Sequence, residues 1–533
     1  MNRYIVSAFM AFTLASNAQA QQDLNADALH GLELDYMESM SSGNVSVYAD
    51  LTYWNLFAVR QHGWNGGSGA CSVPLPGGST LWTFGDSYFG ILSEFYNRRK
   101  YNMPHNAAML QTGEASQDDF TTLNEYVRTT RTLKGTYTYW GKAWLRHPEA
   151  TLGETQIDKG TIDSDHYYRP EDGVVTMGAD GTPMLQLLLS GYDSDDNRNE
   201  TAVATFSLSG TLGDEGYMQL ADLRRDVTDG TAAFGTSVLE DGTYIYLYGT
   251  VPTGGMWGNT CYPVVARTSS RDLCSQWQYR IKNADGQWTW KDTAPTDEEL
   301  KRSGVASSFW CEHPSVFKYG GRYYMCTFEK VNSALYIMDS DQPYGPFQHR
   351  KKLCSMPANQ ADMMRVMVQP QLSRMGELVV SYNMVPASTT TVSKGSDGMA
   401  VTTIVAGPDR SHDAWTSALL QQQHFLRIFG WQSLFGVENT GPIKDAGLET
   451  YTTSIRQPSA VVAKSGLNVS PRLATTSIDI RRDGRFGWTV ASATGSVVLH
   501  GKADGVAHVD VSALPQGVYV VTAGGENCKV VKL

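Results

Sequence analysis

Several familiar signatures are missing from this sequence of 533 residues. It has no phosphate-binding loop, no Gly-rich dinucleotide fingerprint and no Gly-x-Ser-x-Gly elbow, so nothing points to a nucleotide-dependent enzyme or a serine hydrolase. Its seven cysteines lack paired Cys-x-x-Cys spacing, which argues against a structural zinc site. After the first twenty residues no segment is long and apolar enough to span a membrane. Long helix-forming runs are also rare.

Glycine and aromatic residues are abundant instead. The chain has 51 glycines, and aromatic residues make up 11% of it, which favours an all-β protein with many turns. The formal net charge is −11. An acidic chain repels phosphate backbones, so no nucleic acid partner is expected. Neutral sugars suit this charge, and acidic polymers suit it less well.

The first twenty residues have the organisation of a secretory signal peptide. Arg3 precedes the apolar stretch Tyr4–Leu14, and Ala18-Gln19-Ala20 supplies small residues for cleavage. The apolar stretch is too short for a transmembrane helix, which needs about 20 residues. We therefore expect cleavage after Ala20 and a protein that is secreted or held at the outer-membrane surface. Disulfides are allowed there. Cys261 and Cys274 could pair across a loop, and the odd number of cysteines leaves at least one thiol unpaired.

One hairpin design recurs along the chain. It combines a short apolar strand, a Gly-containing turn and a second strand rich in apolar and aromatic residues, and its five copies are 71–84, 174–187, 236–248, 314–326 and 370–382. The second strands are apolar at nearly every position, which is typical of strands buried on both faces. Regular recurrence over roughly 55–105 residues favours a closed radial array. The prediction is a five-bladed β-propeller, with a β-sandwich as the alternative.

These patterns predict four parts of the chain: a signal peptide over 1–20, the propeller over 21–410, a closing segment and linker over 411–466, and a small β-sandwich over 467–533. Six short strands are expected in the last part, at 477–481, 487–491, 496–501, 506–511, 518–522 and 528–532. Its end, Val509-Asp-Val-Ser-Ala-Leu-Pro-Gln-Gly-Val-Tyr-Val-Val521 followed by Lys529-Val-Val-Lys-Leu533, resembles the C-terminal sorting domain of the type IX secretion system. That resemblance implies passage across an outer membrane by the type IX machinery and removal of the tag. The alternative is an ordinary β-sandwich module.

In a propeller, the starts of the innermost strands surround a central cavity where ligands bind. The residues before the predicted first strands include three carboxylates, Glu171, Asp172 and Glu312, and Asp86 follows the strand 81–84. Two or three carboxylates in an aromatic-rich cavity suit glycoside hydrolysis, with one as acid and another as base or nucleophile. Glu171-Asp172-Gly173 and Gly85-Asp86-Ser87 are also compatible with plain turns. The expected contacts to sugar are Trp64, Ser68, Trp82, Asn106, Tyr168, Trp310 and His313, although the aromatic residues could instead fill the core.

Leu81-Trp-Thr-Phe-Gly-Asp-Ser-Tyr-Phe-Gly90 resembles a motif of secreted bacterial propellers related to the endo-D-arabinanases of glycoside hydrolase family 183, whose relatives include domains of unknown function. Glu312-His-Pro314 is similar to the acid motif of glycoside hydrolase family 43. The resemblance spans roughly residues 50–405 and implies an Asp in the Gly-rich segment before the first strand. Ser68 stands there, and a serine cannot replace a carboxylate as proton donor or base at neutral pH.

The leading hypothesis is therefore a secreted glycoside hydrolase that acts on a polysaccharide or glycan. Asp86 would be base or nucleophile, Glu312 the general acid, and Asp172 a pKa-tuning or positioning carboxylate. The alternatives are a non-catalytic glycan-binding propeller at the cell surface, and a metal-dependent lyase. The hydrolase and binding hypotheses require no cofactor, and calcium is the metal that the sequence would allow. Asp193-Ser-Asp-Asp-Asn-Arg-Asn199 has alternating oxygen ligands like a calcium loop, but it lacks the Gly at the sixth position and the distant Glu.

Overall fold

The computed structural model describes residues 28–443 and 467–532, with gaps. The gaps comprise residues 59, 94–95, 114–116, 133–134, 152–164, 179, 211, 213–215, 229–231, 253–260, 270, 307–311, 330–333, 357–360, 387–388, 395–399, 406–417, 419–421, 471–472, 475, 493–495, 516 and 525. The predicted signal peptide lies outside the described residues. The chain divides into two compact units between Thr450 and Tyr451. No helix within the described part combines the length and apolar character needed to cross a membrane.

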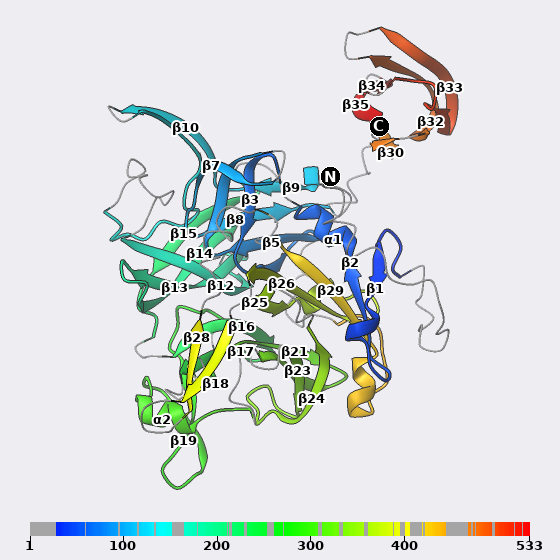
Figure 1. Ribbon diagram of the computed structural model, residues 1–533. Helices are drawn as coiled ribbons and strands as arrows, with labels where there is room; N and C mark the ends of the chain where they lie inside the picture. The colour runs from blue at the N-terminus through cyan, green and yellow to red at the C-terminus, as the bar shows by residue number, and fades with distance from the viewer. Residues whose placement is uncertain are drawn as a thin grey trace. The chain divides into compact units, whose positions relative to one another are not determined.

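Antiparallel strands dominate the first unit, as predicted from its composition (Figure 1). Five sheets of four or five strands carry most of it. They consist of β4 (Cys71–Leu75), β5 (Ser79–Phe84), β8 (Ala107–Gln111) and β9 (Phe120–Thr122); β12 (His166–Met177), β13 (Pro183–Asp193), β14 (Arg198–Leu208) and β15 (Met218–Arg224); β16 (Ala233–Asp241), β17 (Tyr244–Pro252), β18 (Cys261–Thr268), β19 (Gln278–Lys282) and β20 (Trp288–Lys291); β21 (Glu312–Tyr319), β22 (Arg322–Glu329), β23 (Ala334–Ser340) and β24 (Gln348–Ser355); and β25 (Ala361–Val368), β26 (Leu378–Pro386), β29 (His424–Phe429), β2 (Ser46–Asp50) and β1 (Leu34–Tyr36).

The first strands of these sheets, β4, β12, β16, β21 and β25, are neighbours in sequence order. Hydrogen bonds join the last to the first, because Ser72 Oγ donates to Gln369 Oε1 at 2.6 Å and Gly69 N donates to Asn383 Oδ1 at 2.9 Å. A channel lined by residues of all five strands runs between them. This radial arrangement around a channel is that of a β-propeller.

Four of the five predicted hairpins lie where the turn residues indicated, and in the fourth of them Ser315 pairs with Cys326. The fifth prediction was wrong. Its first strand is Ala361–Val368, and Pro370–Leu372 forms the 3-10 turn η3. A proline has no N–H for a ladder and favours the first position of a helical turn, which explains the shift.

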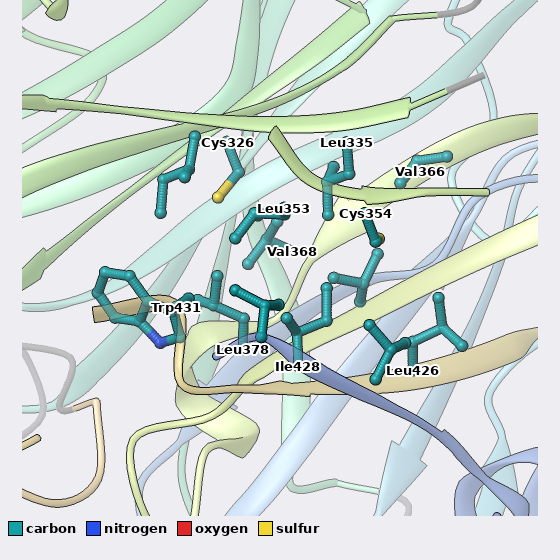
Figure 2. Packing of buried hydrophobic residues seen from close by; sticks show 14 of the residues in the cluster. Cys326, Leu335, Leu353, Cys354, Val366, Val368, Leu378, Leu426, Ile428 and Trp431 are labelled. Atoms are coloured by element: carbon teal, nitrogen blue, oxygen red, sulfur yellow. The ribbon is translucent and has the colours of Figure 1, made fainter. Parts of the chain in front are cut away.

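The fifth sheet combines both ends of the first unit. Strand β29 pairs with β26 on one side and with the N-terminal strand β2 on the other, so the sheet extends beyond residue 410 (Figure 1). Between this sheet and the fourth lies a large apolar core, in which Trp431 and the side chains of β22–β26 and β29 interdigitate (Figure 2). Cys326 and Cys354 are buried in it as free thiols. Cys274 also carries a free thiol, so the bridge considered for Cys261 and Cys274 does not form.

Smaller elements decorate the first unit. They are the helices α1 (Leu51–Leu56) and α2 (Asp297–Arg302), the short turns η1 (Glu38–Met40), η2 (Gln117–Asp119) and η5 (Trp431–Phe435), the sheet of β3 (His62–Gly67), β6 (Ser87–Leu92) and β7 (Arg98–Asn102), and the hairpins β10 (Glu125–Thr132) with β11 (Gly135–Gly141) and β27 (Thr389–Lys394) with β28 (Ala400–Val405). Helix α2 starts at a capping box formed by Thr296 and Glu299, which satisfies its first free N–H groups.

The second unit is one hydrogen-bonded network of β30 (Asn468–Ser470), β31 (Leu473–Ala474), β32 (Ser477–Ser492), β33 (Val497–Asp510), β34 (Gly517–Ala523) and β35 (Glu526–Lys532). The first four of the six predicted short strands therefore form two long strands, β32 and β33. Asp483 and Gly484 form a bulge between Arg482 and Arg485, across which the ladder of β32 and β33 continues. Val490, Val521 and Val530 contribute to a core inside this unit.

Candidate functional site

The innermost strands share an irregularity at the same level of the channel. Strands β12, β16, β21 and β25 each carry extra residues opposite their partner strand. These bulges consist of Glu171 and Asp172, Gly235 and Thr236, His313 and Pro314, and Arg365 and Val366. Bulges re-aim side chains and are common next to active sites. Glu171, Asp172 and His313 therefore lie in bulges inside the strands, whereas the sequence pattern predicted positions before the strands.

We use the term bulge ring for Glu171, Gly235, His313 and Arg365. Arg365 Nη1 lies 3.3 Å from His313 Nε2. A Cβ atom on Gly235 would lie 2.7 Å from the Cβ of Glu171, so the ring tolerates only glycine there. Gly235, His313 and Arg365 have φ values of +117°, +46° and +52°. Such backbone is costly for His and Arg and persists where the surroundings enforce it, often at functional sites.

Asp172 belongs to the channel and not to the ring. Its Oδ2 accepts a hydrogen bond from Val238 N at 2.7 Å, and its Oδ1 lies 3.6 Å from Cys71 Sγ. Both partners line the channel with Asp172. The structure therefore corrects the expected grouping of Asp172 with Asp86: the neighbouring Glu171 shares charged partners with Asp86, because the bulge sends the two adjacent carboxylates to different surroundings.

Asp86 follows β5 and lies among three cationic or hydrogen-donating groups. His105 Nδ1 is 2.7 Å from Asp86 Oδ1, and Arg169 Nη2 is 3.2 Å from Asp86 Oδ2. Burial alone would raise the pKa of this carboxyl. The hydrogen bond from His105 and the charges of Arg169, His105 and Arg365 outweigh burial and lower the pKa to about 2. Asp86 is therefore an ionised, half-buried carboxylate at neutral pH.

An aromatic stack holds the partners of Asp86 in place. The rings of His105 and Tyr167 stack 3.7 Å apart, and Tyr167 stacks on Tyr192 at 5.3 Å. The guanidinium of Arg169 lies 4.6 Å from the ring centre of Tyr192 and also pairs with Asp196 at 3.2 Å. Rings and cation fix each other's orientation, which reduces the freedom that Asp86 would otherwise have.

The pKa of Glu171 is shifted in the opposite direction from that of Asp86. Glu171 is 9% exposed, and its Oε1 accepts a hydrogen bond from Ser190 Oγ at 2.8 Å. Burial raises its pKa, and the opposing charges of Arg365, Arg198 and Arg169 do not offset burial. Arg169 and Arg365 act on both Asp86 and Glu171, so one electrostatic cluster contains two carboxyl groups whose pKa values move apart.

Four predicted sugar contacts are buried instead. Trp64, Trp82, Asn106 and Tyr168 are each at most 1% exposed. Trp64 packs against Phe84, and Tyr168 donates to Glu200 Oε1 at 2.7 Å. Asn106 bonds the backbone of Leu145 and Tyr168. A ring that stacks on a sugar needs an exposed face, so these residues build the scaffold, as the alternative reading of the aromatic residues held.

The other predicted site residues are Ser68, His313, Trp310 and Glu312, and they lie in different surroundings. Ser68 is half-buried beside Asp86, since Ser68 N donates to Asp86 O at 2.9 Å and Gly85 N to Ser68 O at 2.8 Å. His313 belongs to the bulge ring, and burial together with Arg365 lowers its pKa to about 3. Trp310 lies outside the described residues, as does the side chain of Glu312, whose backbone opens β21.

The suggested calcium loop is organised by its own backbone. Asp193 Oδ1 accepts hydrogen bonds from Asp195 N and Asn197 N, both at 3.0 Å, and Asp196 pairs with Arg169. Among the described residues, no group of three or more His, Cys, Asp or Glu side chains could hold a metal ion. In this geometry the loop supplies Asp196 to the Asp86 cluster.

Sequence reasoning missed His105, Arg169 and Arg365 as site residues. Arg169 sits in Tyr167-Tyr-Arg-Pro-Glu-Asp172, whose carboxylates and rings gave the predicted site residues. An arginine between a tyrosine pair and two acids is a usable signal. His105 precedes β8, which pairs with β5 just ahead of Asp86, and Arg365 comes from the first strand of another sheet, so no local pattern marks either residue.

Comparison with known proteins gives the family. Residues 50–431 match the family model "Domain of unknown function (DUF5005)". The chain belongs to this family. A solved structure from Bacteroides ovatus, described as a "putative hydrolase", is similar to it at 30% identity and a TM-score of 0.64, covering 79% of this chain and 98% of that one. The GH43_1 enzyme of Xanthomonas citri in complex with xylotriose aligns at 15% identity over 67% of this chain and 96% of that one, with a TM-score of 0.30 that supports no argument. No curated protein matches the chain significantly.

Proposed function

We propose that this DUF5005 protein is an exported glycoside hydrolase that cleaves a polysaccharide or glycan at the bulge ring. The observation that carries the proposal is the pair Asp86 and Glu171, whose pKa values are displaced in opposite directions within one cluster. Two carboxyl groups with separated pKa values are what acid–base cleavage of a glycosidic bond requires. The likeness to a described hydrolase at 30% identity is consistent with this reading.

In this mechanism the ionised Asp86 acts as base toward a water molecule or as nucleophile toward the anomeric carbon. A protonated carboxyl group donates its proton to the departing glycosidic oxygen, so the sugar–oxygen bond breaks without a free alkoxide. Glu171 suits the acid role because its pKa is raised. Glu312, similar to a family 43 acid motif, is the alternative acid predicted from the sequence.

Three substitutions separate these roles. We expect Asp86→Asn to abolish hydrolysis of a glycan panel, a loss of at least about 10³-fold in kcat for a base or nucleophile. Of Glu171→Gln and Glu312→Gln, the acid's variant should lose activity but regain it on substrates with an activated leaving group. Asp172→Asn serves as the control, because Asp172 faces the channel. Full activity in Asp86→Asn would refute the proposal.

A second function, glycan binding without cleavage, is favoured by one observation. Ser68 lies against Asp86 where related enzymes are expected to carry a carboxylate. Calorimetry that detects oligosaccharide binding, together with unchanged oligosaccharides after long incubation, would replace the hydrolase proposal with this one.

We also propose that the five sheets are five propeller blades, and that the second unit is a β-sandwich sorting domain for type IX secretion. The closed order of β4, β12, β16, β21 and β25 supports the blade count. Mass spectrometry of protein collected outside the producing cells tests the export proposal. An N-terminus at Gln21 and loss of the residues after about 467 are expected. Retention of both ends in the exported protein would contradict it.

A further inference from the structure

Arg365 is half-buried, and its partners differ from those of three other arginines of the first unit. Arg427 contacts Asp50 and Glu377, Arg225 contacts Glu149 and Glu200, and Arg169 contacts Asp86 and Asp196. For Arg365, no carboxylate among the described side chains lies within ion-pair distance, and the group facing its Nη1 is the imidazole of His313. Burying a guanidinium without a countercharge is costly, so such a residue calls for an anionic partner.

Among the described side chains, no carboxylate supplies that negative charge at contact distance, although Arg365 acts on Asp86 and Glu171 at longer range. His313 is neutral at physiological pH, because burial and Arg365 itself keep its pKa low. Asp86 already binds His105 and Arg169, and Glu171 is held by Ser190. Arg198 is a second guanidinium in this region that bonds only hydroxyl groups in the described structure, Ser190 Oγ and Thr201 Oγ1. Arg365 and Arg198 are therefore two guanidinium groups with no carboxylate at ion-pair distance among the described side chains.

The backbone of Arg365 points to a role in the site. An arginine at φ +52° bears a backbone cost that glycine or asparagine would avoid. Its aliphatic stem is fitted to the chain, since a Cβ atom on Gly69 would lie 3.7 Å from its Cβ and Cδ. The fold thus places a half-buried arginine at the ring in a backbone conformation that glycine or asparagine would adopt at lower cost.

We propose that Arg365 recognises an anionic group on the glycan, so that the substrate is an acidic sugar bearing a carboxylate, as in a uronic acid, or a sulfate. The planar guanidinium matches both groups with paired N–H···O bonds. This inference rests on the proposed glycan-cleaving function for its place in the reaction. It also modifies the expectation drawn from the net charge of −11, because the overall charge sets long-range repulsion while the ring sets the local field.

Binding and cleavage are tested separately. Methyl glucuronide, a sulfated methyl glycoside and neutral methyl glucoside are titrated calorimetrically into the full chain and into Arg365→Gln. We expect an anionic ligand to bind the native protein and to lose about 10–100-fold in affinity in Arg365→Gln, as for a lost charged hydrogen-bonded pair. The affinity for neutral methyl glucoside should differ by less than about threefold between the native protein and Arg365→Gln. The arm that binds identifies carboxylate or sulfate as the recognised group.

The matched control is Arg271→Gln, because Arg271 also has a positive φ of +54° but lies outside the ring and pairs with Glu240. It should leave the ratio of anionic to neutral affinity unchanged. A native protein that binds neither anion, or an Arg365→Gln protein that loses both ligand types equally, overturns the inference. Anion binding without any glycan cleavage would refute the hydrolase proposal and leave the recognition by Arg365 standing.

Discussion

Nδ1 of His105 lies 2.7 Å from Oδ1 of Asp86, and the same imidazole ring stacks on Tyr167 with 3.7 Å between ring centres. Because an ionised carboxylate can only accept hydrogen bonds, Nδ1 carries the hydrogen in this contact. The stack fixes the ring and the hydrogen bond fixes the carboxylate. Asp86 is thereby unsuited to be the acid, since a carboxyl group with a pKa of about 2 holds no proton at neutral pH.

Replacing His105 by phenylalanine keeps a ring against Tyr167 and removes the hydrogen bond to Asp86. We expect the pKa of Asp86 to rise, because the hydrogen bond from His105, which offsets the effect of burial, is then absent. Since Asp86 works ionised, the acid limb of kcat/KM should move to higher pH in His105→Phe. The pH–rate profile measures this. His62→Phe, in β3 against Trp140, is the control and should leave the limb in place. An unchanged limb in His105→Phe would show that another group limits activity in acid.

Gly235→Ala should damage the site. The added Cβ would lie 2.7 Å from Glu171 Cβ and would sit at φ +117°, so both the carboxyl position and the bulge must change. We expect a destabilisation of more than about 1 kcal/mol and at least about a tenfold loss of kcat per folded molecule. Gly242→Ala, at φ +65° with nothing within 4 Å, should show the backbone cost alone, with kcat retained. Urea unfolding and active-site-normalised kinetics distinguish them, and equal kcat losses would contradict the role assigned to Gly235.

The hairpins were predictable because each is a local pattern. Asp-Gly and Gly-Gly turns followed by apolar strands gave four of five first strands, and Pro370 misplaced the fifth. Asp86 was found because its motif is local as well. The bulges were not predictable, since an extra residue leaves no mark in an apolar strand. His105 comes near Asp86 through the pairing of β5 with β8, and Arg169 and Arg365 come from two other sheets, so single-residue reasoning chose Asp172 over Glu171.

The buried carboxylate of Glu200 should make stability depend on acid pH. It accepts from Tyr168 Oη at 2.7 Å and Arg225 Nη2 at 2.6 Å. Burial alone would raise its pKa, but His147, whose Nε2 lies 3.4 Å from Glu200 Oε2, and the hydrogen bonds from Arg225 and Tyr168 lower it to about 2. A lowered folded-state pKa contributes stability that is full above the unfolded value of about 4.5 and is lost as pH falls toward 2. The contribution is about 3 kcal/mol.

Urea unfolding at a series of pH values between 6 and 2 checks this. The stability gap between the native protein and Glu200→Gln should narrow as the pH falls through the range from about 4.5 to about 2. Tyr168→Phe removes one donor and should show a smaller version of the same narrowing. A gap that stays constant with pH would mean that Glu200 is not ionised in the folded protein.

Arg427 joins the two ends of the first unit through charge. It lies in β29 and contacts Asp50, at the end of β2, and Glu377, next to β26, and all three side chains are fully buried. Arg427→Met keeps most of the volume but leaves two carboxylates buried without a cation, so we expect a loss of about 3–5 kcal/mol in unfolding free energy. Lys291→Met, which removes a partly exposed pair with Glu299, should cost at most about 1 kcal/mol.

Adding Asp50→Asn and Glu377→Gln to Arg427→Met should restore part of the lost unfolding free energy, because the uncompensated charges are then gone. Failure of the triple variant to recover would show that Arg427 stabilises this sheet through packing instead of charge.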